Sequence, residues 1–157
     1  MPYLVGTPYS MRPKLRNILA GVAGAIASMP ANMFLLGPMA KLTRAPKAPP
    51  YDPTAAPEAM QEVWRAYFAT LEPVHMLGPL IAHWNGAFIG ALVAGLMAAN
   101  RGPKVPLFVA GFVLIGGIAN AFMLPGQPPL FLAVDILGYL PMGWLGWKLA
   151  VKIKPIS

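Results

Sequence analysis

Apolar residues along this chain gather in long stretches. Residues 17–40, 73–100 and 105–134 contain no Asp, Glu, Lys or Arg, and the last stretch continues to Trp147 with Asp135 as its one charged residue. A helix needs about 20 apolar residues to cross a membrane, so the first two stretches fit one helix each. The third is too long and divides at the Pro- and Gly-rich segment 124–129, where helices break. The pattern predicts four membrane-spanning helices, over residues 17–40, 74–99, 105–124 and 130–150.

Composition supports the membrane interpretation. The chain has 157 residues, of which 57% are hydrophobic and 11% charged, whereas a soluble domain carries about 25% charged residues. A soluble chain of this length could not bury four helices that are apolar all round. Cysteine is absent, which excludes disulfides and thiolate metal sites. We therefore expect one all-α integral membrane domain over residues 1–157.

The basic residues predict the orientation in the membrane. The net charge is +7, but the basic residues lie at the ends of the apolar stretches and form no contiguous face for a nucleic acid. With the N-terminus inside, the inner segments carry only basic residues, namely Arg12, Lys14, Arg16, Arg101, Lys104, Lys148, Lys152 and Lys154. The outer segments balance Lys41, Arg44, Lys47 and Arg65 against Asp52, Glu58, Glu62 and Glu72. The positive-inside rule then predicts cytoplasmic N- and C-termini.

The start of the chain also has the pattern of a secretory signal peptide. Residues 12–28 combine a basic start with an apolar run. The small residues that a cleavage site needs are replaced by Met29 and Pro30. An uncleaved first span is the better interpretation.

The one long connection, residues 41–72, has two parts. Its first part is rich in proline and is expected to be extended. In residues 58–71, large apolar side chains recur at helical spacing, at Met60, Val63, Trp64, Tyr67, Phe68 and Leu71. We expect an amphipathic helix lying flat on the outer membrane surface. The alternative, compatible with the first, is a lid over something beneath it.

Small residues predict how the spans pack. Helices in lipid associate through close contact, which glycine and alanine permit. The second span carries small residues at four-residue spacing, at Gly78, Ala82, Gly86, Gly90, Ala94 and Ala98. This stripe predicts a helix-packing face in a compact four-helix bundle. Similar faces also suggest a protein partner or a homo-oligomer within the lipid bilayer.

Polar residues within the spans fall at one depth. At about 1.5 Å per residue, Asn32, His83, Asn120 and Asp135 all lie in the outer half of the membrane. Such residues usually face the bundle interior. We expect Asp135 to point inward, with His83 and Asn120 as the leading partners. Asn85 lies on the opposite face of its helix from His83 and should meet another neighbour. The simplest interpretation of the cluster is hydrogen bonding that fixes helix register.

Weak patterns for metal or cofactor binding are also present. Glu72 and His75 have the Glu-x-x-His spacing of di-iron helix bundles, but further ligands are missing. His83 is a weak candidate for ligating haem or a pigment, since no attachment motif accompanies it. No phosphate loop, nucleophile elbow or zinc-ligand cluster is found in the sequence. We therefore predict no cofactor, no metal site and no catalytic residues, so the chain is not expected to be an enzyme.

Three segments of the second half resemble a known group of proteins. They are 82–86 (Ala-His-Trp-Asn-Gly), 116–125 (Gly-Gly-Ile-Ala-Asn-Ala-Phe-Met-Leu-Pro) and 135–142 (Asp-Ile-Leu-Gly-Tyr-Leu-Pro-Met). Together they look like an uncharacterised family of small four-helix bacterial integral membrane proteins. The resemblance covers about residues 72–150 and implies a bacterial cytoplasmic membrane protein. The resemblance implies no activity for this chain.

Three functions compete at this point. Small-residue stripes and scarce chemistry favour a non-enzymatic accessory or structural subunit of a larger membrane complex. The polar cluster suggests instead a small transporter or proton-coupled channel. The third hypothesis is a membrane protein that binds haem, pigment or a metal.

Overall fold

The computed structural model describes residues 12–50 and 52–153. In these residues the chain is all-α, with five α-helices and one short 3-10 helix. The elements are α1 (Pro13–Thr43), α2 (Pro57–Ala69), η1 (Pro73–Met76), α3 (Leu77–Met97), α4 (Lys104–Met123) and α5 (Pro129–Ile153). Four helices of the described chain are long and apolar enough to cross a membrane, with η1 continuing into α3. The two chain ends and Lys154 lie outside the described residues.

Proline and glycine determine where the helices begin and end. Pro13 and Pro57 stand in the first turn of α1 and α2, where no backbone N–H is needed. The turn between α4 and α5 contains Gly126 at φ +101°, a conformation that glycine adopts without strain. Its Cα faces the backbone of Arg65 on α2. The position therefore requires glycine both for its backbone angle and for the close approach of α2.

The helices agree with the predicted spans, with differences at their ends. The first helix begins at Pro13 and ends at Thr43, beyond the predicted 17–40, and the last begins at Pro129 and ends at Ile153. A charged residue interrupts an apolar stretch but is compatible with an α-helix. These helices therefore continue beyond the apolar residues. The predicted second span, 74–99, begins instead as the 3-10 turn η1 and ends at Met97.

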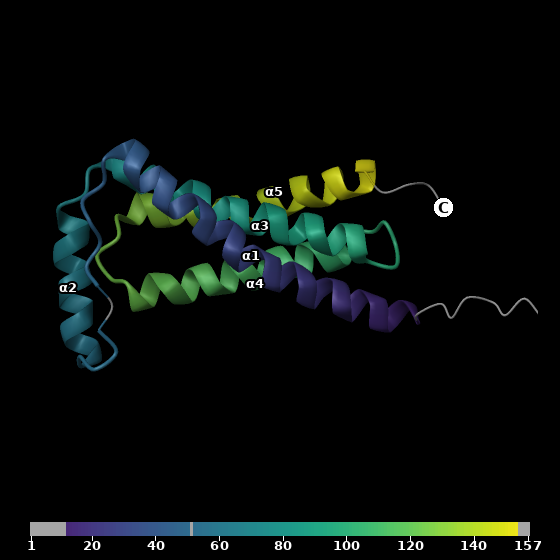
Figure 1. Cartoon of the computed structure of the whole chain (residues 1–157), viewed down its shortest axis with the longest axis horizontal. Coiled ribbons are helices and arrows are strands. Elements are labelled where there is room, and N and C mark those ends of the chain that lie inside the picture. The colour runs from purple at the N-terminus through teal and green to yellow at the C-terminus, as the bar shows by residue number, and fades with distance from the viewer. Residues whose placement is uncertain (1–11, 51, 154–157) are drawn as a thin grey trace, which may run out of the picture.

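The long helices form an up-and-down bundle in which α3 is central. It packs against α1, α4 and α5, whereas α1 also contacts α4 to a smaller extent (Figure 1). Small side chains dominate the core, and the largest fully buried residues are Tyr139, Val109 and Pro106. In Figure 1, α2 crosses one end of the bundle, which we call the α2 end. We call the opposite end, where α1 and α4 begin, the basic end.

Candidate functional site: a polar cluster beside a covered cavity

The polar cluster within the bundle is built on a pair between α3 and α5. His83 Nδ1 lies 2.8 Å from Asp135 Oδ2, and the side chains are 15% and 6% exposed. The same Asp135 oxygen accepts a hydrogen bond of 3.3 Å from the Tyr139 hydroxyl, one helical turn further along α5. The rings of His83 and Tyr139 stack with 6.1 Å between their centroids. Asp135 thus holds an imidazole and a phenol together in the bundle interior.

A second contact fixes α3 against α5 at the same level. Trp84 Nε1 donates a hydrogen bond of 3.2 Å to the Asp135 backbone carbonyl. The Trp84 ring lies against Gly138, where a side chain would collide with it. Neither Tyr139 nor Trp84 is among the polar residues that the sequence places in this cluster. The four-residue spacing of Asp135 and Tyr139 does indicate that the two side chains lie together, because residues at i and i+4 share a helix face.

The asparagines take different positions. Asn85 Nδ2 donates a hydrogen bond of 2.7 Å to the Ala31 carbonyl, so it joins α3 to α1, away from the His83 pair. Neither Asn32 nor Asn120 forms a side-chain hydrogen bond within the described part of the chain, and both line a cavity. Asn32 Oδ1 is buried, as is Asp135 Oδ1, and neither has a partner among residues 12–50 and 52–153. The structure therefore brings His83 to Asp135 and leaves Asn120 in the cavity wall.

The cavity beside this cluster has a volume of about 800 Å³, within the range of small-molecule pockets. It lies between α1, α3, α4 and α5 toward the α2 end, and its polar lining includes Asn32, His83, Asn120, Gln127 and Tyr139. The rest of the wall is mainly aliphatic and aromatic, with Met33, Leu36, Phe112, Val113, Ile115 and Phe131 among its members. This is an apolar chamber with a few polar groups on its walls.

The aromatic face of α2 covers the cavity. Trp64, Tyr67 and Phe68 line it, together with Leu71 just after the helix, and the three rings pack on one another with centroids 5.7–6.0 Å apart. The Tyr67 hydroxyl donates a hydrogen bond of 3.0 Å to the Pro46 carbonyl, which ties α2 to the preceding loop. Partial burial raises the pKa of the Tyr67 phenol, so it stays protonated and remains a donor.

The loop before α2 is ordered by its own polar contacts. The Asp52 carboxylate accepts hydrogen bonds from the Thr54 hydroxyl at 2.7 Å and the Thr54 N–H at 2.8 Å. These bonds to the charged form lower the pKa of Asp52. On α2 itself, Arg65 pairs with Glu62 at 2.7 Å on the exposed side. The helix therefore turns charge outward and aromatic rings inward.

The small-residue stripe of the second span lies inside the bundle. All of its members are buried, at Gly78, Ala82, Gly86, Gly90, Ala94 and Ala98. A Cβ atom on Gly90 would lie 2.9 Å from the Gly24 carbonyl oxygen, and one on Gly86 would lie 3.0 Å from the Ser28 carbonyl oxygen. The backbones of α1 and α3 therefore touch, and the stripe is already occupied by the chain's own helices.

Glu72 and His75 form a local structure. His75 Nδ1 accepts a hydrogen bond of 3.0 Å from the Glu72 backbone N–H, and the Glu72 side chain bonds the His75 backbone in return. This is a capping box at the start of η1. Across the described residues, no group of three or more His, Cys, Asp or Glu side chains could hold a metal ion. The Glu-x-x-His spacing thus has a structural explanation.

Comparisons with protein families, curated proteins and solved structures found no match for this chain. The four long apolar helices make it a small multi-pass membrane protein. The resemblance of its second half to a bacterial four-helix family stays a sequence-based prediction.

Proposed function

We propose that this chain is a non-enzymatic membrane protein that binds a lipophilic small molecule in the cavity beside His83. The observation that carries the proposal is the cavity itself, an apolar chamber of about 800 Å³ whose wall includes the polar side chains of Asn32, His83 and Asn120. A mainly apolar pocket of this size with a few polar groups is typical of small-molecule sites. The polar groups on the wall would orient a bound molecule through hydrogen bonds.

The cluster indicates the polar group of the ligand. A neutral His83 whose Nδ1–H donates to Asp135 presents Nε2 as an acceptor. Such an acceptor favours a ligand with a hydroxyl or another donor, attached to an apolar body that fits the rest of the chamber.

We further propose the membrane arrangement in which this cavity works. The cavity lies in the outer half of a bacterial cytoplasmic membrane, α2 lies at the outer surface as its cover, and both termini are cytoplasmic. The distribution of basic residues supports this orientation. A reporter fused after residue 50 should be active on the outer side, and activity in the cytoplasm would reject the orientation.

A matched pair of ligands and a matched pair of variants test the binding function. A long-chain alkylphenol should bind the purified protein in detergent about tenfold more tightly than the alkylbenzene of equal chain length, because one hydrogen bond is worth about 1 kcal/mol. Gly116→Leu should abolish binding, since Gly116 lines the cavity. Gly111→Leu on the same helix is the control, since Gly111 does not line it. Equal affinity for the two ligands, or equal loss in the two variants, would reject the proposal.

An accessory-subunit role is a second candidate. Around Gly111 of α4, no atom of another described element lies within 4 Å of the position that a Cβ would occupy. The neighbouring Phe108, which does not line the cavity, is exposed. This small-residue surface supports docking of a partner helix. Co-purification with a stoichiometric membrane partner that Gly111→Leu removes would support the role, and a protein that purifies alone from its native membrane would count against it.

A further inference from the structure

Basic residues gather at one end of the bundle. Arg12, Lys14 and Arg16 stand at the start of α1, Arg101 and Lys104 at the α3–α4 connection, and Lys148 and Lys152 in the last turns of α5. Within the described ranges this end carries no Asp or Glu. The acidic residues of those ranges all lie elsewhere, at Asp52, Glu58, Glu62, Glu72 and Asp135. The negative ends of the α3 and α5 dipoles lie at this end as well and offset the positive ends of α1 and α4, so its field comes from the basic side chains. The basic end is therefore a strong attractor of anions.

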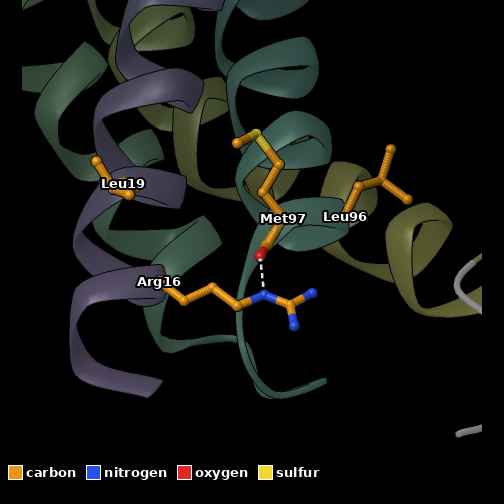
Figure 2. A pocket seen from close by; sticks show the side chains of 4 residues that line it. All are labelled: Arg16, Leu19, Leu96 and Met97. Carbon is orange, nitrogen blue, oxygen red and sulfur yellow. Dashed lines mark hydrogen bonds between the residues drawn. The ribbon is translucent and has the colours of Figure 1, made fainter. Parts of the chain in front are cut away.

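Arg16 is held in place at this end. Its Nε donates a hydrogen bond of 2.8 Å to the carbonyl of Met97, the last residue of α3 (Figure 2). The guanidinium thus spans the ends of α1 and α3. Its two terminal nitrogens form no hydrogen bond or ion pair with any residue in 12–50 or 52–153. They remain as a fixed pair of charged donors.

An apolar groove adjoins this guanidinium. An open cavity of about 490 Å³ is lined by Arg16 together with Leu19, Leu96 and Met97. Leu19 and Met97 are 43% and 44% exposed. Figure 2 shows the two leucines on opposite sides of the Arg16–Met97 contact, Leu19 on α1 and Leu96 on α3. The site therefore combines a positioned cation with walls suited to a hydrocarbon chain.

We propose that this groove binds an anionic phospholipid, with its phosphate on the terminal nitrogens of Arg16 and an acyl chain along Leu19, Leu96 and Met97. Guanidinium and phosphate form charge-assisted, often bidentate, hydrogen bonds. Basic pockets between membrane helices are known to bind anionic headgroups. The apolar walls select a phospholipid over a free phosphate. The site lies at the opposite end of the bundle from α2 and is independent of the cavity beside His83.

The test measures retained lipid by native mass spectrometry of the protein in mild detergent. Phosphatidylglycerol should bind at least about tenfold more tightly than phosphatidylcholine with the same chains, and glycerol 3-phosphate should not displace it. Arg16→Gln should weaken phosphatidylglycerol binding about thirtyfold, because it removes charge-assisted bonds. Lys104→Gln is the control, because it removes one positive charge at the same end but outside the groove. It should weaken phosphatidylglycerol binding about fivefold at most.

A second variant tests the apolar wall without changing the charge. Leu19→Trp should fill the groove and reduce phosphatidylglycerol binding about tenfold, while α1 can accommodate the larger side chain because Leu19 is exposed. Equal binding of the two lipids would overturn the proposal, as would equal losses in Arg16→Gln and Lys104→Gln. Displacement by glycerol 3-phosphate, or unchanged binding in Leu19→Trp, would show a phosphate site without the lipid groove and would also overturn it.

Discussion

The two halves of the bundle are packed in different ways. Toward the basic end, α1 contacts both α3 and α4. A Cβ on Gly24 of α1 would lie 2.8 Å from the Ala94 Cβ on α3 and 3.2 Å from a Val109 methyl carbon on α4. Toward the α2 end, α1 remains on α3 but separates from α4, and the cavity with Asn32 and Asn120 lies between them (Figure 1). Small residues close the first half, and polar residues line an opening in the second. The size of the side chains at each crossing thus decides where the bundle is solid and where it can hold a ligand.

The largest expected effect comes from overpacking the solid half. Gly90→Leu should destabilise the protein by about 3 kcal/mol, because the added side chain meets the Gly24 carbonyl and the Ser28 Cβ. Thermal unfolding in detergent measures the change. Gly111→Leu is the control on α4, with no atom of another described element within 4 Å of its Cβ position. If the two variants unfold at the same temperature, the contrast between a solid and an open surface is wrong.

Removal of the carboxylate should have the next largest effect. Asp135→Ala leaves His83 Nδ1 and the Tyr139 hydroxyl without their buried acceptor, at a cost of about 2 kcal/mol. Asp135→Asn keeps an acceptor oxygen and should recover most of this stability. Thermal unfolding of the two variants side by side measures the difference. Equal destabilisation would mean that the negative charge, and not the hydrogen bonding, holds α3 to α5.

A smaller effect is expected at Tyr139. Tyr139→Phe removes the 3.3 Å hydrogen bond to Asp135 but keeps the ring against Gly117 and His83. The free energy of unfolding should fall by about 1 kcal/mol, as measured in the same thermal assay. In the Asp135→Ala background the same substitution should have no further effect. A full additional loss there would contradict the assigned hydrogen bond.

The smallest effect concerns the cover of the cavity. Tyr67→Phe removes the exposed hydrogen bond to the Pro46 carbonyl and should change global stability by less than about 0.5 kcal/mol. Its effect should be local. Hydrogen exchange should become faster in α2 and stay unchanged in α3, because α2 contains no buried residue and opens independently. Equal acceleration in both helices would show that α2 belongs to the cooperative core.

The sequence by itself determined the helices and their approximate depth. Runs of apolar residues long enough to cross a bilayer predict spans whatever their neighbours are, and the Pro-Gly segment 124–129 separates the last two. The four-residue spacing of Gly78, Gly86 and Gly90 predicts a packing face, since that spacing repeats along one side of a helix. The rise per residue also places His83 and Asp135 at one level. All of these properties are local to one helix.

The tertiary structure alone decided which of these groups meet. Depth does not determine how each helix is rotated about its axis or how far two helices diverge, because both depend on contacts with all neighbours. For this reason Asp135 meets His83 and Tyr139, whereas Asn120 faces the cavity. The cavity itself exists because α1 follows α3 and departs from α4. No pattern within a single helix encodes that divergence, which arises only when the four spans pack together.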